Sequence, residues 1–303
     1  MSGEQSDLSV VIPTFNRRAV LAETLDALSE DAQVSDVRLD VVVVDDGSSD
    51  DTLNMLEQRT DDSFSLRILS QENRGPATAR NRGVRAAQAP FVWFLGDDTR
   101  PRSGTTALHL QALHRGHTAV QGMIHWDPDR DITDLMRFLA PEGPQFYFRG
   151  LKDGETIPWS AVLGSNFSAP TQWLLDEPFD EGFPFAAVED SEMAWRWYRR
   201  GRTAIFQEQA VCWHNHLYDD LAPFLKRQER AGISARYAVS LHPRLFWKLA
   251  LEPYLVGLYK RLRNALASAK ADSEIKVRNK EWERACRKAY LSGFRKGLSD
   301  PTV

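Results

Sequence analysis

Two apolar runs that each end in a pair of carboxylates constrain the fold of this chain more than any other feature. The first is LDVVVVDDGSSDD at residues 39–51, and the second is FVWFLGDDT at residues 91–99. Each run is apolar on both faces, as expected of a buried parallel strand. In open α/β sheets, ligands bind at the carboxyl ends of the strands, so four carboxylates are expected to face one crevice: Asp45, Asp46, Asp97 and Asp98. A divalent metal and the hydroxyls and base of a nucleotide would account for such a cluster.

Strands and helices alternate through the first half of the chain. Pro13 is expected to stop the first strand, Asn16 to cap the next helix, and Pro76 to open a helix that reaches Ala87. The apolar runs predict strands at residues 8–12, 39–44, 66–69, 91–95 and 119–124. This alternation predicts an α/β fold with a mostly parallel, Rossmann-like, doubly wound sheet flanked by helices.

The pattern changes after Asp127. Residues 141–158 are rich in Gly, Pro and aromatic residues and are expected to form a loop region on the substrate side. Pro253 is expected to break the apolar stretch at 245–266 into two helical pieces. The remaining periodic segments predict one strand at 204–213 and helices at 105–115, 189–200, 219–240 and 245–298.

Charge is unevenly distributed along the chain. From Arg244 to Val303 there are 14 Lys and Arg against 6 Asp and Glu, although the net charge of the whole chain is −4. A basic tail behind an acidic body favours either an anionic surface as partner or a solvated helical face. The apolar pieces of this tail are too short and too charged to span a bilayer. We therefore expect either peripheral membrane contact or packing, on the rest of the chain or in a homodimer through the C-terminal helices.

The remaining composition is that of a soluble globular protein. The first residues, MSGEQSDLSVVIP, lack the basic start and long apolar segment of a signal peptide. Cys212 and Cys286 form no metal or disulfide pattern. These features predict a cytoplasmic, reduced protein, with a peripheral position at the inner face of the membrane as the open alternative, and no nucleic-acid partner.

Six motifs together resemble the family-2 glycosyltransferases of the GT-A fold. They are VVIPTFNR at 10–17, VVVVDDGSSD at 41–50, ENRGPATARNRG at 72–83, FLGDD at 94–98, ED at 189–190 and WHNH at 213–216. The resemblance implies an inverting enzyme that transfers a sugar from a nucleoside-diphosphate sugar to a glycan or lipid-linked acceptor. UDP is the expected nucleotide, and the expected role is cell-surface polysaccharide or glycoconjugate synthesis.

The resemblance also implies how the chain is divided. Residues 1–240 would form the GT-A domain, with a nucleotide-binding half at 8–125 and an acceptor-side half at 126–240. Residues 241–303 would form a basic, helical C-terminal extension.

The motifs imply a donor site with a metal. The hard oxygens of Asp98 fit Mg²⁺ or Mn²⁺ in a DXD-like motif whose first position is Gly96. His214 would complete the metal site, with His216 as the open alternative. The guanidinium of Arg80 matches phosphate geometry. The residues expected to bind the donor nucleotide are Pro13, Thr14, Asn16, Arg17, Asp46, Arg80 and Asp97.

Glu189 and Asp190 begin a helix, where the helix dipole also favours carboxylates for structural reasons. The resemblance makes one of them the general base, and we expect Asp190. Residues 164–166 are expected under the donor sugar. Four aromatic residues could stack on the acceptor or simply pack in the core: Trp159, Phe167, Trp173 and Trp195.

Two other functions stay open. A sugar-phosphate nucleotidyltransferase would carry a Gly-rich N-terminal loop with a basic residue, which residues 13–17 do not form. A non-catalytic nucleotide-sugar-binding module would not need the GDD and ED motifs together.

Overall fold

The computed structural model describes residues 6–116, 118–256, 258–259 and 274–297. The chain packs as two compact units, which are described separately. The first comprises Met1–Ile132, Leu139–Glu181 and Asp190–Leu217, and the second comprises Thr133–Phe138, Gly182–Glu189 and Tyr218–Val303. The predicted division of residues 1–240 from 241–303 stays a prediction.

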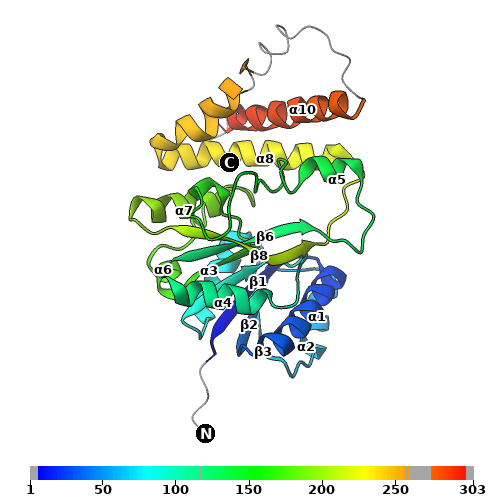
Figure 1. Ribbon diagram of the computed structural model, residues 1–303, viewed down its shortest axis with the longest axis vertical. Coiled ribbons are helices and arrows are strands. Elements are labelled where there is room, and N and C mark those ends of the chain that lie inside the picture. The colour runs from blue at the N-terminus through cyan, green and yellow to red at the C-terminus, as the bar shows by residue number, and fades with distance from the viewer. Residues whose placement is uncertain (1–5, 117, 257, 260–273, 298–303) are drawn as a thin grey trace. The chain divides into compact units, whose positions relative to one another are not determined.

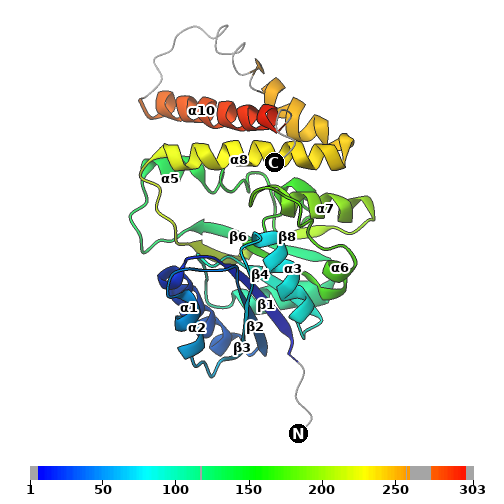
Figure 2. The same ribbon diagram turned by 180° about the vertical axis from the view of Figure 1, so that it is seen from behind.

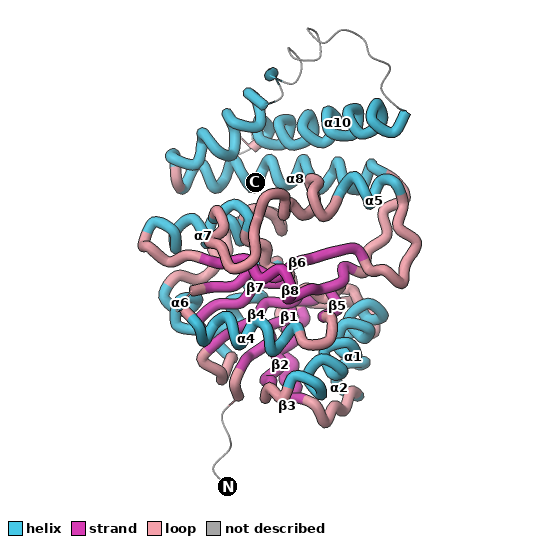
Figure 3. Tube along the Cα trace, in the orientation of Figure 1, coloured by secondary structure: helices cyan, strands magenta, loops and turns pink. Residues whose placement is uncertain are grey.

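An eight-stranded mixed sheet forms the centre of the first unit (Figure 3). Strands β1 to β4 are parallel neighbours, whereas β7 pairs antiparallel with both β4 and β6. Strand β8 is parallel to β6 and antiparallel to β5. In spatial order the strands are β3 (Phe64–Ser70), β2 (Leu39–Asp45), β1 (Leu8–Thr14), β4 (Phe91–Leu95), β7 (Asn166–Pro170), β6 (Ala119–Trp126), β8 (Ala204–His214) and β5 (Thr99–Pro101).

Helices cover both faces of this sheet, with α1 and α4 on one face and α3 on the other (Figures 1 and 2). Alternation along β1 explains this arrangement, because successive side chains point to opposite faces. Val10 and Ile12 belong to the core cluster that contains Leu21 of α1, whereas Val11 is buried on the α3 side. The helices are α1 (Arg18–Ser35), α2 (Thr52–Gln58), α3 (Pro76–Ala86), α4 (Thr105–Arg115), α6 (Thr171–Asp176) and α7 (Glu189–Arg199), with a short 3-10 turn, η1 (Trp159–Ala161).

The α/β class and the alternating order are confirmed, but two local predictions for the first unit were wrong. Strand β1 continues through Pro13 to Thr14, because β4 pairs with β1 only as far as Val11. Beyond that point the missing N–H of proline leaves no partner unsatisfied on that side. Asn16 does not cap α1; the Ncap residue is Arg17, and the Asn16 side chain accepts hydrogen bonds from the 48–50 turn instead.

The second unit is helical in its described part. It contains α5 (Asp134–Leu139), α8 (Leu221–Leu241), the short turn η2 (Pro243–Leu245), a π-helical turn η3 (Trp247–Leu251) and α10 (Glu274–Lys296). Helices α8 and α10 lie side by side, as both ribbon views show (Figures 1 and 2). The predicted helical C-terminal region is therefore confirmed. Among the described helices, none is long and apolar enough to cross a bilayer.

Pro253 does not break the helical segment that contains it, contrary to the prediction. Residues 247–251 form the π-helical turn, and residues 252–256 continue as α-helix. A proline at this position removes the hydrogen bond to the carbonyl four residues earlier, which belongs to Leu249. The hydroxyl of Tyr290 donates to that carbonyl at 2.7 Å. A side chain from α10 thus replaces the missing N–H.

Candidate functional site

The turn after β4 brings Asp98 beside His214. The first residue of the turn, Gly96, donates its N–H to the Ser165 carbonyl at 3.1 Å. A Cβ at Gly96 would lie 2.5 Å from Thr99 Oγ1, so this position of the DXD-like motif requires glycine. Thr99 then pairs with His214 in the β5–β8 ladder. The result is a distance of 3.4 Å between Asp98 Oδ2 and His214 Nε2.

Aromatic rings fix the His214 imidazole in place. The ring is 6% exposed and lies 5.3 Å from Trp126 and 5.1 Å from Phe146, measured between centroids. Phe146 comes from the 141–158 region, which therefore reaches this site as expected. His214 Nδ1 is buried with no hydrogen-bond partner among the described residues. His216 lies next to it, at 5.8 Å between ring centroids.

The two neighbouring carboxylates have opposite electrostatic environments. Burial, followed by the charge of Asp98, raises the pKa of Asp97 to about 7. Burial also acts to raise the pKa of Asp98, but the nearby His214 and Arg17 outweigh it and hold that pKa below its usual range. Arg17 Nη1 is 3.9 Å from Asp98 Oδ2. Arg17 therefore offsets negative charge of this pair at ion-pair distance.

The loop after β1 contacts both carboxylate turns. Thr14 donates its hydroxyl to Asp97 Oδ2 at 2.9 Å. Asn16 has φ 53° and accepts from the Ser49 N–H at 2.7 Å, which joins this loop to the turn after β2. Thr14, Arg17 and Asp97 thus lie together, whereas the Asn16 amide is used within the protein. Pro13 lies just before them in β1, opposite Val44 of β2.

Asp46 is almost fully buried and accepts several hydrogen bonds from the loop before α3. Its Oδ1 accepts from Gln71 Nε2 at 2.8 Å and from the Arg74 N–H at 2.9 Å, and its Oδ2 accepts from the Gly75 N–H at 2.8 Å. This carboxylate therefore shapes the loop that leads into α3. Its predicted contact with the nucleotide stays a prediction.

Residues 164 and 165 join Asp190 to the Asp98 turn. The N–H of Gly164 donates to Asp190 Oδ2 at 3.0 Å, while the next carbonyl, of Ser165, accepts from Gly96. Asp190 is partly exposed at the start of α7, and its other oxygen accepts from the Ser191 N–H. Glu189, the alternative base, is 4% exposed.

Arg80 lies under the same segment. A Cβ at Gly164 would be 3.1 Å from Arg80 Cζ, so the guanidinium covers this glycine directly. The other side of the guanidinium lies 5.4 Å from the ring centre of Phe179. Arg80 is 8% exposed, whereas the side chains of Arg74 and Arg85 are more than half exposed. Of the arginines near α3, Arg80 is thus placed beside the Asp190 segment.

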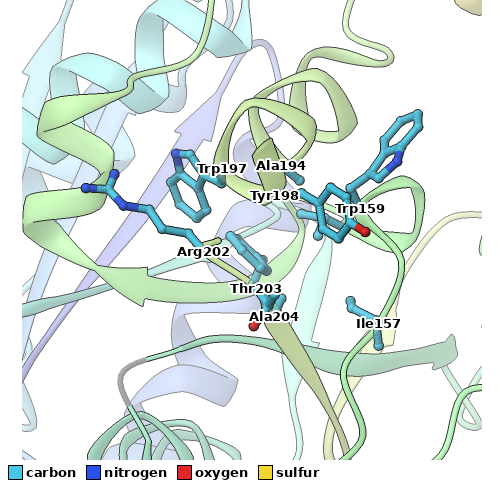
Figure 4. A pocket seen from close by; sticks show the side chains of 10 residues that line it. Ile157, Trp159, Ala194, Trp197, Tyr198, Arg202, Thr203 and Ala204 are labelled. Atoms are coloured by element: carbon cyan, nitrogen blue, oxygen red, sulfur yellow. The ribbon is translucent and has the colours of Figure 1, made fainter. Parts of the chain in front are cut away.

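The four aromatic residues proposed for acceptor stacking have different surroundings. Phe167 is fully buried and belongs to the core, so stacking on a sugar is excluded for it. Trp173 packs edge-on against Trp197. Trp159 lines a small, mostly apolar pocket with Trp197 and Tyr198, as Figure 4 shows. Trp195 lies under the guanidinium of Arg199.

Sequence reasoning missed the contacts that hold the WHNH motif. The N–H of Asn215 donates to the Asp98 carbonyl at 2.7 Å, and its side-chain amide donates to Glu23 at 2.5 Å. Glu23 also pairs with Arg130 at 2.7 Å. The motif pointed to its histidines, but no local signal marks Glu23 on α1. These contacts fix the position of His214 relative to Asp98.

The fold and motifs agree with comparisons to known proteins. Residues 9–161 match the family model described as glycosyl transferase family 2, and the chain belongs to this family. The family assignment supports a sugar-transfer activity, as the motifs implied. The GT-A fold is confirmed by a solved mannosyltransferase from Pyrobaculum calidifontis, in complex with GDP-Man and Mn²⁺. That structure has a TM-score of 0.69 at 20% identity, and the match covers 99% of this chain and 89% of the other.

Two curated relatives match parts of the chain. The GalNAc(5)-diNAcBac-PP-undecaprenol beta-1,3-glucosyltransferase of Campylobacter jejuni is 34% identical over 118 residues, which are 38% of this chain and 37% of that protein. The validoxylamine A glucosyltransferase of Streptomyces hygroscopicus subsp. jinggangensis is 30% identical over 223 residues, or 64% of this chain and 52% of that protein. The chain thus spans only about a third to a half of the length of these relatives.

Proposed function

We propose that this chain transfers a sugar from a nucleoside-diphosphate sugar to an acceptor hydroxyl, with inversion at the anomeric carbon. The observation that carries the proposal is the pair of hydrogen bonds made by residues 164 and 165. This segment donates a hydrogen bond to Asp190 on one side and accepts one from Gly96 on the other. The candidate base and the turn that carries the candidate metal carboxylate therefore flank one short segment, which supports a reaction site between them.

The residues present fit a divalent cation. Asp98 offers a carboxylate and His214 an imidazole nitrogen, 3.4 Å apart, and both donor types suit Mn²⁺, whereas Mg²⁺ favours the oxygen donors. The described residues contain no group of three or more His, Cys, Asp or Glu side chains that could hold a metal. The remaining ligands would be oxygens of the diphosphate and water, as is usual for Mg²⁺ with nucleotides. When bound, the cation would offset charge on the leaving diphosphate.

Asp190 would act as the general base. The acceptor oxygen attacks the anomeric carbon from the face opposite the diphosphate, and the acceptor proton passes to the Asp190 carboxylate. The bond between the anomeric carbon and the diphosphate oxygen breaks, and its electron pair leaves with the nucleoside diphosphate. The greater exposure of Asp190 supports this role over Glu189, which is buried.

The donor and acceptor are proposed from the site and from similar proteins. Thr14, Arg17, Asp46 and Asp97 would hold the nucleotide, with UDP as the expected one; a Staphylococcus aureus TarS structure of the same fold binds UDP. Arg80 would support the diphosphate side through its place beside Gly164. The Campylobacter relative is named for an undecaprenol-linked acceptor, which supports a glycan or lipid-linked acceptor and a role in glycoconjugate or polysaccharide synthesis.

Calorimetry of UDP binding tests the metal and donor site. Binding to the wild type should strengthen at least about tenfold on addition of Mn²⁺ or Mg²⁺, because Asp98 would hold a cation that offsets charge on the diphosphate. Asp98→Ala should lose this enhancement. Asp26→Ala, which removes an exposed carboxylate of α1, serves as the matched control and should keep it. Equal UDP affinity with and without metal in the wild type would contradict the proposed site.

A further inference from the structure

Large apolar side chains gather on one short stretch of the second unit. This exposed apolar segment is the described part of residues 246–259. Soluble proteins expose apolar side chains singly, whereas a contiguous group marks an interaction surface. Seven side chains of the segment are between 39% and 64% exposed: Phe246, Trp247, Tyr254, Leu255, Val256, Leu258 and Tyr259.

The first part of the exposed apolar segment packs on α8 and α10. Leu245 and Ala250 are buried, and the turns that contain them pack on α8. Tyr290 of α10 donates its hydroxyl to the Leu249 carbonyl at 2.7 Å, and the Phe246 ring lies 6.4 Å from that of Phe294. The turn that presents Phe246 and Trp247 is therefore packed on α8 and α10, and the other five exposed side chains follow it at residues 254–259.

Basic residues accompany these apolar side chains. Arg244 and Lys248 are exposed within or next to the segment, and the sequence continues with Lys260, Arg261 and Arg263, which lie outside the described residues. The single acid in this stretch of sequence, Glu252, pairs with Lys248 at 3.0 Å. Aromatic and aliphatic side chains with a basic surround are typical of a helix that lies in the headgroup region of a membrane.

We infer that residues 246–259 dock on the surface of an anionic lipid bilayer. Trp and Tyr favour the interface between hydrocarbon and water, and Lys and Arg gain energy near anionic headgroups. A homodimer surface fits less well, because the centres of such interfaces are depleted of lysine. This inference concerns where the chain works and does not depend on the identity of the donor or of the base.

Vesicle co-sedimentation tests the inference with the full chain. The probes are vesicles of phosphatidylglycerol mixed with phosphatidylcholine and vesicles of phosphatidylcholine alone. The wild type should bind the anionic vesicles, and 0.5 M salt should abolish binding because the Debye length is then about 4 Å. The double variant Trp247→Ser/Tyr254→Ser should bind at least about tenfold more weakly. Lys248→Glu should weaken binding several-fold through charge alone.

The matched control is Val34→Ser/Leu175→Ser, which removes two exposed apolar side chains from the first unit and should bind like the wild type. Each variant should melt at nearly the same temperature as the wild type, because the positions are exposed, and thermal melting checks that it is folded. Three results would each overturn the inference: no binding of the wild type to anionic vesicles, equal binding to neutral vesicles, or undiminished binding of the Trp247→Ser/Tyr254→Ser variant. A dimer in light scattering that this variant dissociates would overturn it too, by assigning the surface to a second copy.

Discussion

The two pairs of adjacent aspartates look alike in the sequence but have different surroundings in the structure. After β2, Asp46 accepts three short hydrogen bonds from the protein, two from backbone N–H groups and one from a side-chain amide. After β4, the basic side chains beside Asp98 are His214 at 3.4 Å and Arg17 at 3.9 Å. The pKa of Asp97 is raised to about 7, first by burial and then by the charge of Asp98.

This difference distinguishes a carboxylate that stabilises the fold from one that is available to bind a ligand. A carboxylate that accepts hydrogen bonds from several N–H groups holds the loop that donates them, and removing that carboxylate costs stability. A carboxylate held mainly by ion pairs at longer distances keeps lone pairs for a ligand. Asp46 therefore shapes the loop before α3, in addition to its predicted contact with the nucleotide, whereas Asp98 would meet a cation.

The largest expected effect comes from a third carboxylate that shares features of both pairs. Asp190 accepts from Gly164 but stays partly exposed. Asp190→Asn preserves its shape and removes the proton acceptor, so transfer should fall roughly 10²- to 10⁴-fold. UDP affinity in calorimetry should not change. Glu189→Gln is the companion variant, and near-normal turnover of Asp190→Asn would move the base role away from Asp190.

A buried histidine, whose pKa is shifted by burial as that of Asp97 is, makes the stability of the fold depend on pH. His109 of α4 hydrogen-bonds Ser168 and Asn166 at 2.8 Å each, and burial lowers its pKa to about 4. It is neutral in the folded protein, whereas the unfolded chain takes up its proton below about pH 6.5. Stability from this group is therefore complete above pH 6.5 and is lost as the pH falls towards 4, by about 3 kcal/mol at pH 4.

Urea unfolding at pH 7 and pH 4 measures this loss. His109→Gln keeps a donor and an acceptor but cannot titrate, so its stability should fall about 3 kcal/mol less than that of the wild type over this range. Equal losses in the two proteins would show that His109 is not the group responsible.

The comparison of the two pairs is tested directly by removing charge from each. Asp46→Asn loses charge-assisted hydrogen bonds to Arg74 and Gly75, so the free energy of unfolding should fall by about 1–3 kcal/mol. Asp98→Asn, the matched comparison, removes the repulsion with Asp97 and also the attraction to Arg17, so the two effects oppose each other and the free energy of unfolding should fall by less than in Asp46→Asn. If Asp98→Asn destabilised the fold more than Asp46→Asn, the division into framework and ligand carboxylates would be wrong.

The sequence predicted those parts of the molecule whose chemistry is local. The Val-rich run before Asp45 and Pro76 at the start of α3 each carry their signal within a few residues. Strand β7 was missed, because five residues are too few to show a period, and it enters the sheet antiparallel between β4 and β6. Its insertion, together with the antiparallel pairing of β5 with β8, makes the sheet mixed.

The other features that were not predicted depend on contacts between residues that are distant in sequence. Nothing near Pro253 indicates that Tyr290 will satisfy the carbonyl of Leu249. Likewise, nothing in an Asp-Asp pair reveals how many N–H groups will reach it once the chain has folded. The candidate site residues could therefore be proposed as a set from the sequence, whereas the hydrogen bonds that each one makes within the protein required the structure.

The smallest expected effect concerns two residues with positive φ, one beside the first aspartate pair and one before Glu189 and Asp190. The turn after β2 places Gly47 at φ 82°, whereas the turn before Glu189 places Val188 at φ 75°. A β-branched residue is strained there by roughly 1–2 kcal/mol. Glycine is normally less stable than alanine by about 0.5–1 kcal/mol, but at this position the order should reverse. Val188→Gly should therefore have a free energy of unfolding about 1 kcal/mol higher than that of Val188→Ala, as measured by urea unfolding. The usual order, with the alanine variant more stable, would show that the backbone before Asp190 stores no such strain.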